Sequence, residues 1–374
     1  MKKIIPYLNS VMFCLVLLVL SASLILTSQE VYSEREKRYL AGFPELGLER
    51  IMDGDFQSDL EDWIADQFPF RDGFVGIHAY WNLLIGQNTQ QDIYYADQVY
   101  LINAPAAQDL TMFHTTISRF DQFASNCGVP VSMIMVPSTG YLKQNLLPIG
   151  TLSYPDAQMF VDLEQMTSNL RLIDIRSTLQ SMDGERPVCY RTDHHLSAAG
   201  NYAIYQQWCM EADMQSRSPS DYEITLIPGF YGTTWSGSGY WLIKPDTLEI
   251  WDSGVNVDVT ITDGGEPPVT TDSLFYRDHL QALDMYPVYL DGNHCEVEII
   301  NHDAPDRSIL LIKDSYAHCF ATFLTEQYSH VYLLDLRYYR GSITDYISEK
   351  NIDEVLFFYG TSTLLTDSNS AWLF

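Results

Sequence analysis

Residues 308–324, SILLIKDSYAHCFATFL, form the stretch that decides the fold of this chain. The run SILLIK has the length and the apolar character of a buried strand, and the residues from about 316 onward have the pattern of a helix. Asp314, Ser315 and Tyr316 form the short junction between them. A strand that turns directly into a helix is typical of a parallel sheet covered by helices, so this stretch predicts an α/β domain.

The same alternation recurs along the chain. Further strands are expected over residues 129–136, 170–175, 330–336 and 353–360, and helices over about 107–126, 157–168, 198–213, 316–328 and 341–350. Together they predict a parallel sheet flanked by helices within residues 101–374. Residues 214–300 interrupt the alternation with clusters of Gly, Pro, Ser and Thr and with strand-like pieces. We therefore expect a β-rich insertion there.

Residues 1–29 have the composition of an export signal. Lys2 and Lys3 precede an uncharged apolar run over residues 11–27, and no A-x-A cleavage site follows it. We therefore expect an uncleaved membrane anchor, whereas cleavage would give a secreted protein. An N-terminal apolar segment normally delivers the chain behind it outward, so the rest of the protein is expected outside the cytoplasm. Residues 30–100 are expected to form a helical stalk and a first helical layer.

The composition argues against a nucleic-acid partner and against a disulfide framework. The chain has 49 acidic and 21 basic residues, a formal net charge of −28, and its field repels polyanions. Beyond Cys14, the five cysteines show no CxxC or zinc-like spacing. We expect most of them to be small buried hydrophobes, while one or two disulfides stay open. No cofactor is expected.

Ser315 is the strongest candidate for a nucleophile. In open parallel sheets, polar residues at the carboxyl ends of strands face the crevice where ligands bind. Ser315 follows such a strand, at a turn where backbone N–H groups of the next helix can stabilise an oxyanion. Tyr316 lies beside it and is a candidate for contact with the substrate. The alternative is that Asp314 or Ser315 only caps the helix.

A second stretch, RTDHHLSAAG at residues 191–200, offers the groups that a nucleophilic serine needs. On an extended segment Asp193 and His195 point the same way, so the carboxylate can orient the imidazole. The imidazole can then take the proton from Ser315. Ser197 suits the N-cap of the following helix, which places the pair in the loop before that helix.

Other roles for the neighbouring polar residues stay open. His194 is expected to point elsewhere and to pack or polarise the loop. A metal site at Asp-His-His would need further ligands at recognisable spacings, which the sequence lacks, so no metal is expected. His318 competes with His195 for the role of base, because it stands three residues after Ser315 on the same helix face. It has no obvious orienting carboxylate.

Two further features have a functional and a structural interpretation. Arg337, at the end of a predicted strand, can hold an anionic group or form an ion pair with a carboxylate such as Asp335. The aromatic residues of the insertion can form a surface for sugar stacking, but ordinary packing is the simpler expectation in a chain so rich in tyrosine. These residues are Tyr231, Trp235, Tyr240, Trp241 and Trp251.

Three stretches together resemble a known family. They are DGDFQSDLEDWIADQFPFRD at residues 53–72, YRTDHHLSAAGNYAIY at 190–205, and LLIKDSYAHCFATFL at 310–324, which LLDLRYY follows. The chain is similar to the DHHW protein family and, more distantly, to exported SGNH-like alginate O-acetyltransferases, whose D-x-H pair precedes the serine. The resemblance covers most of residues 30–370. It implies an SGNH-hydrolase-like sheet in circularly permuted order.

The resemblance also implies roles for single residues. Asp193, His195 and Ser315 match the catalytic triad of the acetyltransferases, in which the serine carries the acyl group before transfer to a sugar hydroxyl or to water. Gly292 and Asn293 are similar to the glycine and asparagine that donate to the oxyanion in SGNH enzymes. His194, Tyr316 and Arg337 complete the candidates for contact with the substrate or the oxyanion.

The implied function is that of an extracytoplasmic O-acyltransferase, with acetyl as the expected group, or an esterase acting on a cell-surface polysaccharide. A multi-pass membrane O-acyltransferase would then supply the acyl group. The alternative is a non-catalytic glycan-binding or cell-envelope assembly protein that retains the fold. Two positions depart from the family pattern, because Leu196 stands where DHHW has tryptophan and Lys313 stands where the usual G-D-S has glycine.

Overall fold

The structure of the protein, a computed structural model, describes residues 5–182 and 186–373. These residues divide into two units. The first comprises the described residues up to Gln90 together with Ser236–Leu242, and the second comprises those of Gln91–Trp235 and Ile243–Phe374. The domain boundaries expected from the sequence stay predictions.

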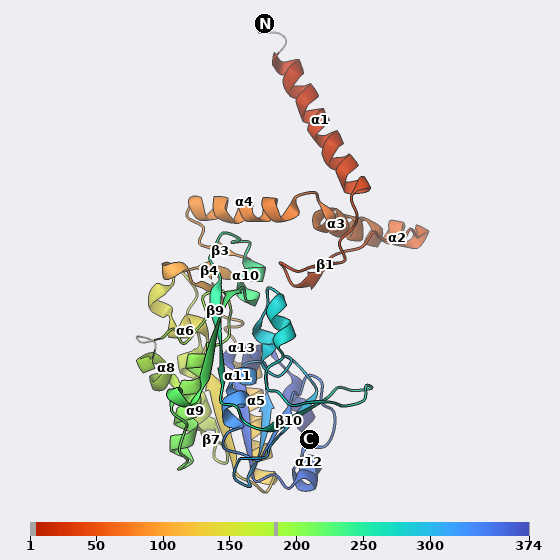
Figure 1. The fold of residues 1–374 in the computed structure, drawn as a ribbon. Coiled ribbons are helices and arrows are strands. Elements are labelled where there is room, and N and C mark those ends of the chain that lie inside the picture. The colour runs from red at the N-terminus through yellow and green to blue at the C-terminus, as the bar shows by residue number, and fades with distance from the viewer. Residues whose placement is uncertain (1–4, 183–185, 374) are drawn as a thin grey trace. The chain divides into compact units, whose positions relative to one another are not determined.

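An eight-stranded sheet lies at the centre of the second unit (Figure 1). Its strand order is β11-β10-β12-β14-β13-β15-β6-β7. The five strands from β14 to β7 are parallel, and β12, β10 and β11 extend one edge in antiparallel pairing. The bounds are β6 Val131–Val136, β7 Arg171–Leu172, β10 Val257–Thr262, β11 Val269–Thr271, β12 Glu296–Asn301, β13 Ser308–Lys313, β14 His330–Leu334 and β15 Glu354–Gly360. The predicted α/β fold with a mostly parallel sheet is confirmed.

Helices cover both faces of this sheet because its parallel strands are apolar on both sides. Phe357 and Phe358, neighbours in β15, are both fully buried but belong to different core clusters. The cluster around Phe358 includes α8 Arg176–Met182, α9 Ala198–Glu211 and α11 Ala317–Leu324. The cluster around Phe357 includes α5 Thr111–Asn126, α7 Asp156–Met166, α12 Ile343–Lys350 and α13 Thr361–Thr366. The second unit therefore has three layers, with the sheet in the middle.

The predicted insertion is β-rich, as expected. Besides the antiparallel edge of the main sheet it contains β8 Glu223–Phe230, which pairs with β9 Asp246–Asp252. Trp235 and Trp251 are buried, which supports packing rather than sugar stacking for these aromatic residues. The remaining short elements are β3 Thr89–Gln90, β4 Ile93–Tyr95, β5 Leu101–Asn103, α6 Thr139–Leu142 and α10 Thr233–Ser238.

The first unit begins with a long apolar helix, α1 Ile5–Leu26. Within it, residues Asn9–Leu26 have a mean hydropathy of 2.4, and α1 is long and apolar enough to cross a membrane. This fits the predicted membrane anchor and equally a signal sequence. The other elements of the unit are short strands and three helices, namely β1 Tyr32–Ser33, β2 Arg38–Tyr39, α2 Leu48–Asp53, α3 Asp55–Gln67 and α4 Arg71–Leu84.

The cysteines behave as the sequence indicates. All six are free thiols, and four of them are buried, namely Cys127, Cys189, Cys209 and Cys319. Burial raises the pKa of the Cys319 thiol, which lies on the core-facing side of α11. A buried thiol with a raised pKa is a poor nucleophile, so Cys319 does not compete with Ser315.

Candidate active site

Ser315 lies in the turn between β13 and α11, at the carboxyl edge of the sheet. The side chain of Asp314 holds this turn in place. It accepts hydrogen bonds from the amide of Tyr316 (3.0 Å), from the amide of Gly360 (2.9 Å) and from the hydroxyl of Thr363 (2.6 Å). Asp314 therefore fastens the turn to the end of β15 and to α13. The alternative that Asp314 or Ser315 caps the helix is wrong, because the N-cap of α11 is Tyr316 and no side chain of the described residues caps it. Asp314 braces the turn instead, and the hydroxyl of Ser315 is left for another partner.

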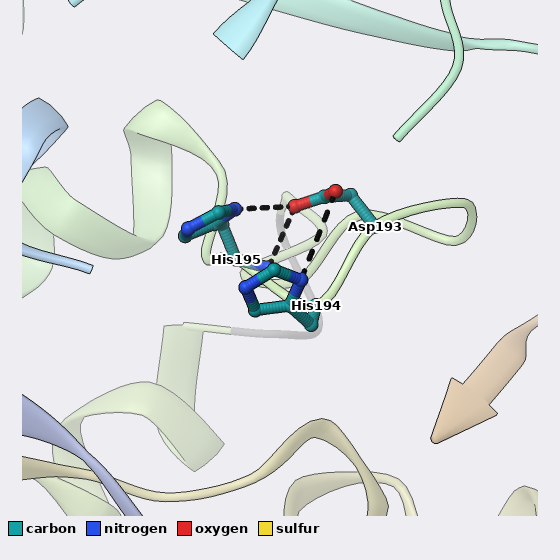
Figure 2. A group of neighbouring side chains, drawn as sticks. All are labelled: Asp193, His194 and His195. Atoms are coloured by element: carbon teal, nitrogen blue, oxygen red, sulfur yellow. Dashed lines mark hydrogen bonds and ion pairs between the residues drawn. The ribbon is translucent and has the colours of Figure 1, made fainter. Parts of the chain in front are cut away.

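That partner is His195. Ser315 Oγ lies 2.9 Å from His195 Nε2, and His195 Nδ1 lies 2.6 Å from Asp193 Oδ1. Figure 2 shows the second of these contacts. Because the Asp193 carboxylate can only accept, Nδ1 carries the ring proton and Nε2 accepts from the serine hydroxyl. The structure thus brings the three predicted residues into one hydrogen-bonded chain.

Asp193 is almost fully buried and richly hydrogen-bonded. Its Oδ1 also accepts from the amide of His195 (2.9 Å), and its Oδ2 accepts from the amide (2.7 Å) and the hydroxyl (3.0 Å) of Thr233. Burial opposes ionisation here, but the nearby imidazoles of His195 and His194 and these donors outweigh it. The pKa of Asp193 is therefore held well below its ordinary value.

The loop that carries Asp193 and His195 is closed by its own backbone. Ser197 caps α9 by accepting from the amide of Gly200 (3.1 Å), and its hydroxyl donates to the carbonyl of Pro187 (2.7 Å). The amide of Ser197 donates to the carbonyl of Val188 (2.9 Å), so the two ends of the loop lie side by side. As the sequence predicts, the D-x-H pair lies just before the helix, where residues two apart can point the same way.

The ring of His195 lies between two other rings. Tyr286 is stacked on it at 3.8 Å between centroids and 10° between planes, and His194 lies 3.9 Å away at 36°. Nδ1 of His194 lies 2.8 Å from the hydroxyl of Thr233, so His194 braces the same loop that holds Asp193. The tilt of His195 is therefore limited from both sides.

Tyr316 holds the two halves of the site together. Its hydroxyl donates to the carbonyl of His194 (3.0 Å), and its ring centroid lies 5.1 Å from that of His195. Gly360 makes room for the ring, because a Cβ there would lie 2.4 Å from it. Tyr316 is thus a bridge between the serine turn and the histidine loop, and its predicted contact with the substrate stays a prediction.

Arg337 is hydrogen-bonded to both Asn293 and Asp335. The guanidinium of Arg337 donates to both carboxylate oxygens of Asp335 (2.9 and 2.5 Å) and to Asn293 Oδ1 (2.9 Å). Of the two roles considered for Arg337, the geometry favours the structural ion pair. The roles of Gly292 and Asn293 at the oxyanion stay predictions.

Lys313 and His318 form a buried group behind the serine turn. Lys313 Nζ lies 2.9 Å from His318 Nε2 and 3.3 Å from Asp335 Oδ2. Burial lowers the pKa of Lys313, and it holds the pKa of His318 well below its ordinary value. Since Nε2 of His318 accepts from Lys313, the geometry favours His195 over His318 as the base for Ser315.

A pocket of about 70 Å³ lies next to His194 and Tyr316, which both form part of its wall. Its other lining residues come largely from β5, from the segment after β6 and from the start of α13. Asp156 lines it too and accepts from the amide of Ser138 (2.6 Å), and burial raises the pKa of this carboxyl group. The pocket offers a ligand apolar walls with hydroxyl and carboxyl groups beside the histidine loop.

Asp193, His194 and His195 also have the composition of a metal site. One ligand atom from each lies within 4.8 Å of the others. These atoms already serve hydrogen bonds, since Asp193 accepts from His195 (Figure 2). Asp193 also accepts from Thr233, and His194 is hydrogen-bonded to the hydroxyl of Thr233. An ion here would have to displace the contact that orients His195. The hydrogen-bonded arrangement fits a triad better than a metal centre.

The sequence model described as DHHW protein matches residues 36–98 and 156–334. The chain belongs to the DHHW protein family. The match includes Asp193, His195 and Ser315 and thus the whole hydrogen-bonded chain. No curated protein matches the sequence.

Solved structures share the DHHW fold. A DHHW family protein from Eubacterium siraeum is 20% identical, with a TM-score of 0.65, and the alignment covers 76% of this chain and 95% of that one. PatB1 from Bacillus cereus, solved with a sulfonyl adduct, is 20% identical, with a TM-score of 0.64 and coverage of 74% and 97%. The O-acetyltransferase domain of Pseudomonas putida AlgJ is more distant, at 11% identity and a TM-score of 0.46, with coverage of 74% and 92%. The first two likenesses establish the fold and leave the reaction to be argued from the site.

The two departures from the family pattern occupy different surroundings. Leu196, in place of the tryptophan, is buried in the core. Its backbone forms an isolated antiparallel β-bridge with that of Cys189, where the two ends of the histidine loop meet. Lys313, in place of the glycine, is buried with His318 and Asp335. Neither substitution displaces Asp193, His195 or Ser315 from the hydrogen-bonded chain.

Sequence reasoning missed several residues that build the site. Thr233 binds both Asp193 and His194, and Tyr286 stacks on His195, yet both come from the insertion and show no local pattern. Gly232 is equally close, since a Cβ there would lie 2.1 Å from Asp193. Ser138 could have been found by the strand-end rule, because it follows β6 just as Ser315 follows β13.

Proposed function

We propose that this protein is an extracytoplasmic O-acyltransferase, most simply an O-acetyltransferase, or an esterase, and that it acts on a cell-surface polysaccharide. The observation that carries the proposal is the hydrogen-bonded chain from Asp193 through His195 to Ser315. A serine whose proton can pass to an oriented imidazole is activated for attack on an ester carbonyl. The fold places it at the edge of the sheet where ligands bind.

In the first half-reaction, Ser315 Oγ attacks the carbonyl carbon of an acyl donor while its proton moves to His195 Nε2. The tetrahedral intermediate collapses, and the leaving alcohol takes the proton back from His195. Ser315 then carries the acyl group as an ester. Asp193 stays ionised and stabilises the imidazolium, in accord with its lowered pKa.

In the second half-reaction, a sugar hydroxyl or water attacks the acyl-serine. His195 takes the proton from the attacking oxygen and returns it to Ser315 Oγ as the new ester or acid leaves. Transferase and esterase thus share one acyl-enzyme and differ in the acceptor. The pocket beside His194 and Tyr316 supports an acceptor of small polar and apolar groups, such as a sugar ring edge.

The amide of Ser315 is the best-placed donor for the oxyanion. The amides of Tyr316, Ala317 and His318 donate within the turn, to Asp314 and to the carbonyl of Ser315. Within residues 5–182 and 186–373, the amide of Ser315 has no such partner. The sequence predicts that backbone amides at the start of the helix stabilise the oxyanion. The amide that we propose for this role is that of Ser315.

The N-terminal helix supports the proposed location, and the family resemblance supports the proposed partner. An anchored α1 would keep the site at the membrane, where a multi-pass membrane O-acyltransferase can pass acyl groups to Ser315. The partner rests on the resemblance to the alginate O-acetyltransferases. The competing role, glycan binding through the aromatic insertion, is weakened because Trp235 and Trp251 are buried.

The test uses the full chain in detergent with p-nitrophenyl acetate as donor. Wild type is expected to release nitrophenol and to show an acetylated Ser315 peptide by mass spectrometry. Ser315→Ala and His195→Ala should both lose turnover by about 10³-fold or more, and Ser315→Ala should lose the adduct. Ser348→Ala, an exposed serine on α12, is the matched control. Equal activity in all four proteins, with no adduct, would exclude the proposed chemistry.

A further inference from the structure

Helix α4 carries a row of large apolar side chains that are exposed to solvent. They recur at intervals of three and four residues, which places them on one face of the helix. The row, called the α4 stripe below, consists of Phe74 (51% exposed), Ile77 (69%), Trp81 (60%) and Leu84 (77%) on α4, together with the exposed residues that flank the helix, Phe70 (81%) and Ile85 (55%). Contiguous exposed apolar rows of this kind mark an interaction surface.

The opposite face of α4 is already occupied within the same unit. Gly76 and Ala79 are buried there, and a Cβ on Gly76 would lie 2.8 Å from the ring of Trp241. The indole of Trp241 donates to the carbonyl of Asp72 (2.9 Å), and the ring of Tyr80 lies 5.6 Å from that of Tyr240. Since these contacts fix the rotation of the helix, the α4 stripe is turned away from the segment that α4 packs on.

The start of α4 is tied to the chain that leaves α1. The side-chain amide of Gln67 both donates to and accepts from the backbone of Glu30 (2.9 and 3.1 Å), and Arg71 forms an ion pair with Glu36. Glu30 follows the end of α1, Leu26, by four residues, a reach of at most about 14 Å. A membrane that holds α1 therefore lies close to the first turn of α4.

We propose that the α4 stripe lies in the interfacial layer of the same membrane that α1 enters, and that α4 is a second, surface-bound contact with phospholipid. An apolar helix face with phenylalanine and tryptophan suits the boundary between headgroups and acyl chains. The stripe has no charged residue, and residues 30–90 carry twelve acidic against five basic side chains. Apolar burial rather than attraction to anionic lipid drives this contact.

The contact would fix the height of the first unit above the membrane, whereas α1 alone would leave it free to swing. It does not depend on the chemistry of Ser315, so it can be tested whether or not the protein transfers acyl groups.

The experiment places the full chain in phosphatidylcholine vesicles whose acyl chains are brominated near the headgroup. Bromine quenches tryptophan fluorescence only at short range. Wild type is expected to show a quenched component, and Trp81→Phe should lose most of it. Trp372→Phe, which removes an exposed tryptophan of the second unit, is the matched control and should keep it. Quenching that is absent in wild type, or equal in Trp81→Phe, would overturn the proposal.

Further measurements distinguish phospholipid from a second copy of the chain as the partner of the α4 stripe. Ile77→Glu with Leu84→Glu keeps Trp81 as a reporter and should abolish its quenching while helix content by circular dichroism is unchanged. Persistent quenching in this variant would contradict the proposal.

If a second copy covered the stripe instead, Trp81 would be shielded from bromolipid and from aqueous acrylamide alike, and cross-linking would give a dimer. Replacing part of the lipid by phosphatidylglycerol should not increase the quenching, and an increase would overturn the apolar origin of the contact.

Discussion

Tyr286 lies parallel to His195, with ring centroids 3.8 Å apart and 10° between the planes. Its hydroxyl is buried and finds no hydrogen-bond partner among the residues that the structure describes. The ring therefore matters for holding the imidazole, and the hydroxyl does not contribute a bond to it. A lone buried hydroxyl costs free energy that a phenylalanine would avoid.

Substitutions of Tyr286 should separate these two contributions. Tyr286→Phe keeps the stacked ring, so we expect turnover close to wild type and a stability that is equal or slightly higher. Tyr286→Ala opens a cavity beside His195 and should cost about 3–5 kcal/mol of unfolding free energy, with a clear loss in kcat. Denaturant unfolding and the nitrophenyl ester assay measure both effects. A large loss of activity in Tyr286→Phe would show that the hydroxyl has a role in the reaction.

Gly232 should tolerate no side chain. A Cβ at this position would lie 2.1 Å from Cβ of Asp193, and the carboxylate would have to move away from His195. We expect Gly232→Ala to lower turnover by about 10²-fold or more, since a shift of about 1 Å in a catalytic group has effects of that size. Gly264→Ala is the control, because a Cβ there meets nothing within 4 Å. Similar activity in both variants would contradict the proposed role of Asp193.

The ionised carboxylate of Asp193 should stabilise the folded protein, and acid should remove this stabilisation. Its pKa in the folded protein lies well below the ordinary 3.8, so its contribution is fully present above about pH 4 and is lost as the pH falls through the folded value. The difference in unfolding free energy between wild type and Asp193→Asn should therefore be constant from about pH 5 to 7 and shrink in stronger acid. Asp162→Asn, which alters the more exposed pair with His114, should show a smaller difference throughout. A gap that widens in acid would contradict the ionised state.

Lys313 should make the free energy of unfolding depend on pH in the alkaline range. Burial lowers its pKa below 10.5, so the unfolded chain binds more protons between the two values and stability rises with pH there. Lys313→Met should remove that slope while Arg337 still pairs with Asp335. Asp335→Asn should cost about 3–5 kcal/mol of unfolding free energy, because it leaves the buried Lys313 and the partly buried Arg337 without their counter-ion. Lys350→Met, from a half-exposed pair with Glu298, is the control for losing a lysine and should change little.

The parallel part of the fold could be predicted because its strands are short, continuous apolar runs in the sequence. SILLIK and DEVLFFYG are apolar on both faces, as strands between two helical layers must be, and they became β13 and β15. The antiparallel edge was not foreseen. β10 and β12 alternate between buried residues and residues that are partly or fully exposed, so each is covered on one face, and its place in the main sheet depends on pairing with distant strands.

The candidate site shows the same division. Asp193 and His195 are two residues apart, and Ser315 ends a strand, so local spacing was enough to single them out. Gly232, Thr233 and Tyr286 reach the site only because the insertion folds back onto the histidine loop. No periodicity in the sequence reports such a return, since it is a property of the packed tertiary structure.

The placement of β15 has a consequence for the order of synthesis and folding. β15 lies between β13 and β6 and pairs with both, and the amide of Gly360 at its end holds Asp314 beside the serine. Every one of these contacts waits for a strand that leaves the ribosome after the other strands of the sheet. The centre of the sheet is therefore closed last, and the turn that carries Ser315 acquires its final anchors only when translation has passed Gly360 and Thr363.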